Sequence, residues 1–238
     1  MATITSKTEF LQVISDRLGR PCPTELPRFK RVNTISTTHL TDRSPEDLLT
    51  ILKEKAKTIH TQIIESTKKE LSTTIAAFIR KNSSGKIMLS TDKQFEIYGL
   101  EELYQSTEWD KHQVVKWRPE LSCREENIKN ASESDLAIVF GDYLLAESGS
   151  VSVESRPGQG RSLHFLPSRY LAIVPLSRLL PRSTQLAHIY DQKARQSETI
   201  GSAINLISGP SNSGDIEMIL VVGVHGPLEV SYLIIKDC

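Results

Sequence analysis

The sequence has few cysteines and no cluster of metal ligands around them. Its three cysteines, Cys22, Cys123 and Cys238, lie far apart, with no Cys-x-x-Cys pair and no histidine at ligand spacing. Structural zinc and iron–sulfur clusters normally need about four local ligands, so we expect neither in this chain alone. An odd, scattered set also argues against a disulfide framework. A lone cysteine is more often a packing residue than a nucleophile.

Long apolar runs and an excess of one charge are also missing. The longest apolar runs, such as residues 218–222, are far shorter than a membrane span, and residues 1–10 lack a basic start followed by an apolar block. Lysine plus arginine equals aspartate plus glutamate, 29 against 29, which gives no electrostatic case for nucleic acid. We therefore expect a soluble, cytoplasmic protein with no membrane span and no nucleic-acid partner.

Common catalytic and nucleotide-binding signatures do not occur. There is no Walker sequence, no His-Glu-x-x-His zinc motif and no Gly-x-Ser-x-Gly elbow. Gly158-x-Gly160 does not match a dinucleotide fingerprint, because Leu163 replaces the third glycine and no strand–turn–helix pattern surrounds it. The sequence therefore predicts no bound cofactor in this chain.

Helical and strand patterns alternate through the first part of the chain. Ser44 is a capping residue, followed by proline and two acids, which is typical of a helix start. The apolar periods predict helices at 5–20, 44–66, 68–81, 94–104 and 124–131, and strands at 86–90, 113–117 and 135–140. This alternation predicts an α/β domain with a mainly parallel sheet covered by helices.

The remaining segments predict an N-terminal appendage and a β-rich insertion. Residues 27–42 show no clear period and indicate an extended arm, which would dock on its own domain, reach a partner or form a poorly ordered leader. We thus divide the chain into a helix and arm at 1–43 and an α/β domain at 44–238. Strand-like pieces at 141–155, 161–167 and 170–175 predict the insertion, followed by a helix at 183–199 and a last strand at 228–236.

A turn-rich stretch at 207–227 holds two acids and a histidine around an apolar run. Serines, glycine, proline and asparagine at 208–213 indicate a turn. Ile216, Ile219 and Leu220 recur at helical spacing, so we expect a short buried helix capped by Asn212 or Gly214.

Several motifs carry a family resemblance. They are Gly209-Pro-Ser-x-Ser-Gly-Asp215-Ile-Glu217, Gly223-Val-His-Gly-Pro227, Asp135-Leu-Ala-Ile-Val139, Ala146-Glu-Ser-Gly-Ser-Val151 and Gly158-Gln-Gly-Arg161 with Leu166-Pro167. Together they resemble the lactate-utilisation (LUD) domain family, and within it the LutC branch. The resemblance is tight over the C-terminal half and looser over everything after about Arg43. Two departures keep their hydroxyl groups: Ser148-Gly-Ser150 where the family usually has Thr-Gly-Thr, and Ser213-Gly-Asp215 where it has Thr-Ala-Asp.

The resemblance implies a fold, a pathway and partners. The fold is similar to the NagB/RpiA/CoA-transferase-like fold, with ligand sites at the carboxyl ends of the strands. The pathway is the cytosolic oxidation of L-lactate to pyruvate, in which LutA-like and LutB-like partners carry the iron–sulfur clusters and this chain is an accessory or substrate-handling subunit. Two alternatives stay open: a stand-alone enzyme acting on an acyl-CoA, sugar phosphate or folate-like ligand, and a module that senses lactate or pyruvate.

Three residues are candidate catalytic groups. Glu147 lies at a predicted bend between strands, and a glutamate forms the covalent acyl intermediate in CoA-transferase relatives of this fold. His225 has an unperturbed pKa near physiological pH and suits general acid–base chemistry. Asp215 is the third candidate, and it could also lie beside a metal ion. Each also has a structural interpretation, as a solvated turn glutamate, a turn histidine or a helix cap.

A second set of residues is predicted to bind a small carboxylate ligand or a phosphate. Two guanidinium groups around a turn suit bidentate contacts to an anion, although solvated arginines in a hairpin turn are about as common. Backbone N–H groups at a helix start also bind anions, and the loop at 209–217 is expected at the carboxyl edge of the sheet. The set is Arg156, Gln159, Gly160, Arg161, Gly209, Ser211, Ser213 and Glu217.

Overall fold

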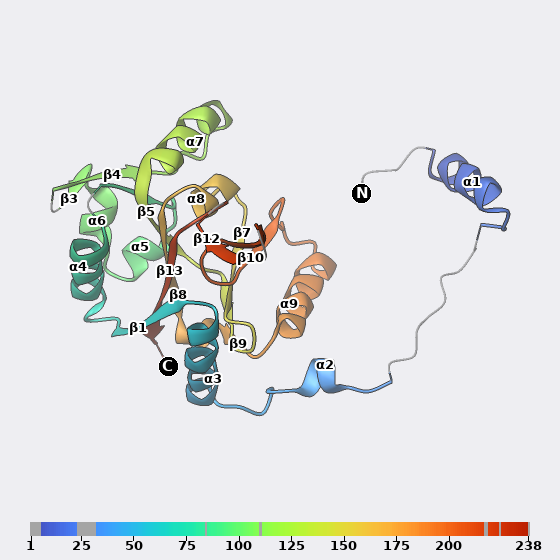
Figure 1. The fold of residues 1–238 in the computed structure, drawn as a ribbon, viewed down its shortest axis with the longest axis horizontal. Coiled ribbons are helices and arrows are strands. Elements are labelled where there is room, and N and C mark those ends of the chain that lie inside the picture. The colour runs from blue at the N-terminus through green and yellow to red at the C-terminus, as the bar shows by residue number, and fades with distance from the viewer. Residues whose placement is uncertain are drawn as a thin grey trace. The chain divides into compact units, whose positions relative to one another are not determined.

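The structure is a computed structural model that describes residues 6–22, 32–83, 85–109, 111–216, 219–223 and 225–237. It forms two compact units, residues 1–35 and residues 36–238. The first unit contains the helix α1 (Lys7–Leu18), which ends at Gly19 in the left-handed conformation, φ 62°. Helix and stop signal agree with the sequence prediction. Figure 1 shows the elements of both units.

Part of the predicted arm docks on its own unit. Residues 27–31 lie outside the described residues, and the short helix α2 spans Ile35–Thr38. Thr184 donates a hydrogen bond to the carbonyl of Ser36, and Gln185 Nε2 donates to the carbonyl of Thr37 at 3.2 Å. Both donors lie in the first turn of α9 (Ser183–Arg195). The segment at 36–38 is therefore held against the α/β unit.

A seven-stranded sheet forms the centre of the larger unit (Figure 1). Its spatial order is β1 (Thr61–Thr67), β13 (Glu229–Lys236), β8 (Arg169–Pro175), β5 (Ser134–Phe140), β2 (Lys86–Leu89), β4 (His112–Lys116) and β3 (Glu108–Trp109). Each neighbouring pair is parallel except β3 with β4, which is antiparallel. This confirms the predicted α/β class with a mainly parallel sheet.

Side chains on successive strand positions enter two separate cores. On β2, Ile87 and Leu89 face one core and Met88 faces the other, as expected for a strand buried on both faces. The first core is covered by α4 (Leu71–Asn82), α5 (Gln94–Ile97) and α6 (Glu101–Gln105). The second is covered by α3 (Pro45–Thr58), α7 (Arg124–Glu133), α8 (Arg161–Phe165) and a smaller sheet.

The smaller sheet is the predicted β-rich insertion. Its strands in order are β10 (Ile204–Ile207), β7 (Ser150–Glu154), β6 (Tyr143–Leu145) and β9 (Leu179–Leu180). The short 3₁₀ helices η1 (Leu121–Cys123) and η2 (Leu176–Arg178) precede α7 and β9. Two parts of the prediction are wrong: residues 161–165 form the helix α8, and residues 169–175 form β8, a central strand of the large sheet. Their short apolar runs are locally ambiguous.

The helix predicted at 44–66 ends early. Ser44 caps the helix as predicted, and it forms a capping box with Asp47, whose N–H donates to Ser44 Oγ at 3.1 Å. The helix stops at Thr58, His60 takes the positive φ of 52°, and β1 begins at Thr61. The apolar residues of 59–64 fit both a helical stripe and a strand buried on two faces, so the period could not locate this boundary.

The helix predicted at 94–104 is interrupted. It consists of α5 and α6, separated by Gly99 at φ 72°. A glycine adopts this left-handed conformation at little cost, and the helix stops there.

The helix predicted at 216–220 is wrong. The chain instead forms a hairpin of β11 (Asn212–Ile216) and β12 (Ile219–Val222), in which Asn212 lies opposite Val222. Glu217 lies outside the described residues. Residues 219–222 read Ile-Leu-Val-Val, and β-branched side chains favour a strand, which outweighs the helical spacing.

Candidate functional site

The topological switch point of the large sheet lies between β2 and β5, at its carboxyl edge. These neighbouring strands send the chain in opposite directions, since β2 continues toward β4 and β5 continues toward β8. The first connection contains α5 and α6 on one face, and the second contains β6, β7 and α8 on the other. Ligands of open α/β sheets bind at such a switch point.

Arg156 bridges the two strand ends at this switch point by binding two carboxylates. Its Nη1 donates to Asp142 Oδ1 at 2.8 Å, and its Nη2 donates to Asp92 Oδ2 at 3.2 Å. The two side chains are only 11% and 12% exposed, and they follow β5 and β2 directly. Burial acts to lower the pKa of Arg156, but attraction to Asp142, its hydrogen bond and attraction to Asp92 outweigh burial and raise the pKa. The positive charge of Arg156 is thus largely neutralised by Asp92 and Asp142.

The two glycines after Arg156 are required by close packing. Arg156 and Gln159 exchange backbone hydrogen bonds of 3.1 and 2.9 Å, which closes a tight turn. A Cβ atom at Gly158 would lie 2.2 Å from the carbonyl oxygen of Thr91, and one at Gly160 would lie 2.2 Å from Trp117 Cζ2. The Gly-x-Gly pair therefore seats this turn on the ends of β2 and β4.

Gln159, in this turn, and His164, in α8, are buried and have polar atoms without hydrogen-bond partners among the described residues. Gln159 Nε2 donates to the carbonyl of Glu154 at 3.0 Å, and His164 Nδ1 lies 3.0 Å from Tyr170 Oη. Among the described residues, Gln159 Oε1 and His164 Nε2 have no hydrogen-bond partner. Burial, with the charge of Arg156, lowers the pKa of His164 to about 3. Gln159 is 1% exposed, so its side chain faces the interior and not solvent.

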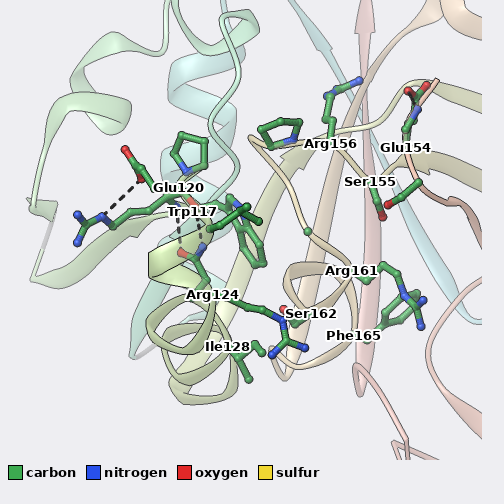
Figure 2. A pocket seen from close by; sticks show the side chains of 18 of the residues that line it. Trp117, Glu120, Arg124, Ile128, Glu154, Ser155, Arg156, Arg161, Ser162 and Phe165 are labelled. Atoms are coloured by element: carbon green, nitrogen blue, oxygen red, sulfur yellow. Dashed lines mark hydrogen bonds and ion pairs between the residues drawn. The ribbon is translucent and has the colours of Figure 1, made fainter. Parts of the chain in front are cut away.

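A groove of about 1350 Å³ opens beside the turn, between the start of α7, α8 and the connection from α9 to β10. In Figure 2, Trp117 lies on one side, Glu154 and Arg156 on the other, and Arg124 and Arg161 below. Five basic and two acidic side chains line it: Arg118, Arg124, Arg156, Arg161, Lys193, Glu120 and Glu154. The lining therefore has a surplus of positive charge.

Three of these cations are already paired. Arg118 Nη1 lies 3.0 Å from Glu126 Oε2, and Arg156 binds the two aspartates. Lys193 Nζ lies 3.9 Å from Glu154 Oε2 and 5.1 Å from the centre of the Tyr190 ring. In the described part of the chain, the exposed side chains of Arg124 and Arg161 form neither an ion pair nor a hydrogen bond. These two guanidinium groups remain available to a ligand.

The described residues 209–216 of the predicted ligand loop lie at the opposite edge of the sheet from the one predicted. The N–H of Ser211 donates to the carbonyl of Pro227 at 2.9 Å, and the N–H of Leu228 donates to the carbonyl of Ser168 at 2.8 Å. Leu228 and Ser168 immediately precede β13 and β8, which places the loop at the amino edge. The reason is that β10 belongs to the smaller sheet, so the chain returns from it to the start of β13. With no helix after the loop, the predicted anion site at a helix start has no basis.

The motifs around Glu147 and Gly209 meet at Tyr232. Tyr232 Oη lies 2.8 Å from the carbonyl oxygen of Ile207 and 3.0 Å from that of Gly149, and donates to both. Beside it, the hydroxyl groups of Ser148, Ser150 and Ser208 form a chain with distances of 2.7 and 2.6 Å. The hydroxyls of Ser148 and Ser150, which the family resemblance singled out, thus connect their turn to the turn at Ser208. Tyr232 itself was missed, because only its place in a predicted strand was visible.

The predicted catalytic residues have separate surroundings. Glu147 Oε2 accepts a hydrogen bond from Arg182 Nε at 2.6 Å. His225 is exposed, and its backbone N–H donates to Ser211 Oγ at 3.1 Å. Ser213 and Asp215 belong to β11. Gly209 has φ 75°, and a Cβ there would lie 2.1 Å from the carbonyl oxygen of Ile59, so this position requires glycine. The catalytic roles of Glu147, Asp215 and His225 stay predictions.

The groove contains residues that the sequence analysis did not select. Trp117 ends the strand predicted at 113–117, and Asp92 and Asp142, which bind the groove residue Arg156, come just after the strands predicted at 86–90 and 135–140. That position was a usable signal, since such strand ends meet at one edge. Arg124 and Phe165 carried no comparable signal, because the folding of α7 and α8 against each other brings them into the groove.

Two further properties concern the described residues alone. They include no helix that is both long and apolar enough to cross a membrane. They also include no group of three or more His, Cys, Asp or Glu side chains arranged to hold a metal ion.

Sequence and structure comparisons identify relatives of the chain. The family model described as LUD domain matches residues 49–235. Lactate utilization protein C of Bacillus pumilus (strain SAFR-032) is 38% identical, and that of Geobacillus thermodenitrificans (strain NG80-2) is 39% identical, each with 99% of this chain and 98% of the relative aligned. The crystal structure of a DUF162 family protein from Deinococcus radiodurans has a TM-score of 0.55 at 12% identity, covering 82% of this chain and 99% of that one. This structural likeness supports the α/β fold.

Proposed function

Because the chain belongs to the LUD domain family, we propose that it is a LutC-like component of a cytoplasmic system that oxidises L-lactate to pyruvate. The observation that carries this proposal is similarity along nearly the whole chain to relatives named lactate utilization protein C. This similarity extends beyond the family domain at 49–235, because 99% of this chain aligns with the relative from Bacillus pumilus.

We propose an accessory or substrate-handling role with iron–sulfur partners. Oxidising lactate to pyruvate removes two electrons, and the sequence of this chain has no signature for a group that accepts them. LutA-like and LutB-like partners would supply the iron–sulfur clusters. The helix α1 exposes Phe10, Val13 and Leu18, and this apolar face is our candidate for partner contact.

We assign ligand contact to the groove at the carboxyl edge. Arg161 and Gly160 contribute directly to its wall, and Arg156 fixes the turn that carries them. Two available arginines give this groove the chemistry to hold an organic anion.

A pull-down from lactate-grown cells under anaerobic conditions tests the role. We expect the tagged chain to elute with cysteine-rich partners and with iron, whereas a variant lacking residues 1–22 elutes without them. A deletion strain should grow normally on glucose and fail on L-lactate. Normal growth of that strain on L-lactate, with no second lactate dehydrogenase present, would contradict the proposal.

A second candidate is a stand-alone enzyme that acts on a larger ligand. The volume of the groove favours it, since about 1350 Å³ far exceeds a three-carbon acid. Under this alternative, the purified chain turns over an acyl-CoA, sugar phosphate or folate-like compound without partners. Iron-free monomers or homo-oligomers from the pull-down would favour it.

A further inference from the structure

We infer that the groove beside α7 and α8 binds a purine nucleotide, a ligand that joins phosphate groups to a flat aromatic base. This inference rests on the proposed assignment of ligand contact to the groove, and it specifies the ligand class. Three properties carry it: the two available arginines, the exposed aromatic surface and the volume.

The charge of the groove is concentrated at two side chains. Arg124 starts α7 and Arg161 starts α8, two helices that pack against each other. Neither is neutralised by another described side chain, whereas the other basic residues of the groove are paired. A guanidinium group binds a phosphate through two parallel hydrogen bonds, and two such groups match a doubly charged phosphate better than a single carboxylate.

The aromatic surface is held in place. The indole of Trp117 packs on Gly160, and the backbone of Trp117 bonds at both ends: its N–H donates to the carbonyl of Leu89 at 2.8 Å, and its carbonyl accepts from the Thr91 hydroxyl. Phe165, from α8, is 37% exposed and lines the same groove. Fixed aromatic side chains bind flat bases by stacking, with little loss of side-chain freedom.

The volume of the groove favours a ligand larger than a three-carbon acid. Ligand pockets generally measure roughly 300–1,000 Å³ and bury most of the ligand. At about 1350 Å³ the groove leaves most of its surface uncovered when a three-carbon acid binds at Arg161. A nucleotide has the length to bring its phosphates to Arg124 and Arg161 while its ring contacts Trp117 or Phe165 (Figure 2).

Calorimetric titration of the purified full chain with ADP tests the inference. We expect ADP to bind at least tenfold more tightly than adenosine, inorganic phosphate or L-lactate. Adenosine lacks the phosphates, inorganic phosphate lacks the aromatic base, and L-lactate lacks both. Arg124→Gln and Arg161→Gln should each weaken ADP binding by about tenfold, the loss of one charged hydrogen-bonding group. Arg43→Gln is the matched control, because Arg43 is exposed outside the groove, and it should bind ADP normally.

Fluorescence identifies the ring contact. The chain has two tryptophans, so Trp109→Phe leaves Trp117 as the single reporter. ADP should change its emission, and inorganic phosphate should not. Phe165→Leu should weaken ADP binding several-fold without affecting inorganic phosphate. Unfolding temperatures of all variants show whether they are folded.

Either of two results would overturn the inference. One is the absence of ADP binding at millimolar concentration by the folded chain, and the other is equal affinity in the Arg124→Gln/Arg161→Gln double variant. Tight binding of L-lactate with none of ADP would also reject it while leaving the lactate role intact. Conversely, the purified chain could bind ADP while the deletion strain grows normally on L-lactate. That pair of results would reject the proposed function and leave this inference intact.

Discussion

Gly160 lies so close to the indole of Trp117 that a Cβ atom on residue 160 would approach Trp117 Cζ2 to 2.2 Å. Its backbone is extended, with φ −90°, so this glycine is required by the neighbouring ring and not by its own conformation. The contact joins the segment before α8 to the end of β4, and thereby sets the width of the groove on one side.

Replacing Gly160 with alanine should therefore destabilise the protein. We expect Gly160→Ala to lower the free energy of unfolding by about 1–3 kcal/mol, the usual cost of overpacking. Urea unfolding measures the effect. In the double variant Gly160→Ala/Trp117→Leu, the second substitution should restore part of the loss. Simple additivity of the two losses would show that the contact does not limit residue 160.

Removing the charge of Arg156 should leave Asp92 and Asp142 without their common partner. Because Arg156 is 34% exposed, solvent screens part of this loss, and we expect Arg156→Met to cost roughly 2 kcal/mol. Arg195→Met breaks an exposed pair with Asp191 and should cost less than about 0.5 kcal/mol. Equal costs in thermal or urea unfolding would mean that Arg156 acts as an ordinary surface arginine.

His164 should make stability depend on pH. Its pKa is about 3 in the folded chain, because of burial and the charge of Arg156, compared with 6.5 ordinarily. Its contribution is fully present above about pH 6.5 and is lost as the pH falls from 6.5 to 3, by up to about 1.4 kcal/mol per pH unit.

The free energy of unfolding should be measured for wild type and His164→Phe across that range. We expect the variant to lose less stability than wild type between pH 6.5 and pH 4. Parallel curves for the two proteins would show that His164 takes up its proton equally in the folded and unfolded states.

Loss of the Tyr232 hydroxyl should loosen two turns at once. Tyr232→Phe keeps the buried ring and removes the donor to Gly149 and Ile207, so we expect a cost of about 1–3 kcal/mol. Hydrogen exchange should become faster at 147–150 and 207–209 and stay unchanged at α4. Tyr98→Phe, on the far core, is the control. Uniformly faster exchange would indicate a general loss of stability instead.

Glu147→Gln separates a catalytic role from a structural one. If the ion pair with Arg182 is its role, the partly exposed carboxylate contributes about 1 kcal/mol or less, and growth on L-lactate is unchanged. If Glu147 forms a covalent intermediate, growth fails although the unfolding temperature is retained. Arg182→Gln provides the control, because it breaks the same pair while keeping the carboxylate.

Local signals predicted most elements of this fold. The predicted cap at Ser44 and the predicted stop at Gly19 involve residues within a few positions of each other, and both are present. The strands β2, β4 and β5 were visible as short apolar runs between helical patterns. Errors occurred where two periods fit equally, as at the boundary between α3 and β1 and in the hairpin of β11 and β12.

The groove could not be predicted in the same way, because it depends on contacts between distant segments. Arg156 and Arg161 were selected from one turn, but the site also needs Asp92 from the connection after β2, and Trp117 and Arg124 from the stretch after β4. The misplaced loop at 209–217 has the same origin. Its composition indicates a turn, whereas its edge of the sheet depends on which sheet β10 joins.

The position of β13 affects how the protein folds during its synthesis. This strand lies between β1 and β8, although the chain reaches it only at residues 229–236. During translation β1 leaves the ribosome about 160 residues before its only neighbour in the sheet, so its backbone groups and the apolar faces beside it stay unpaired throughout that time. A nascent chain stalled before residue 229 therefore exposes two strand edges. Such chains should be preferred clients of chaperones, and release of the final strand should end that dependence.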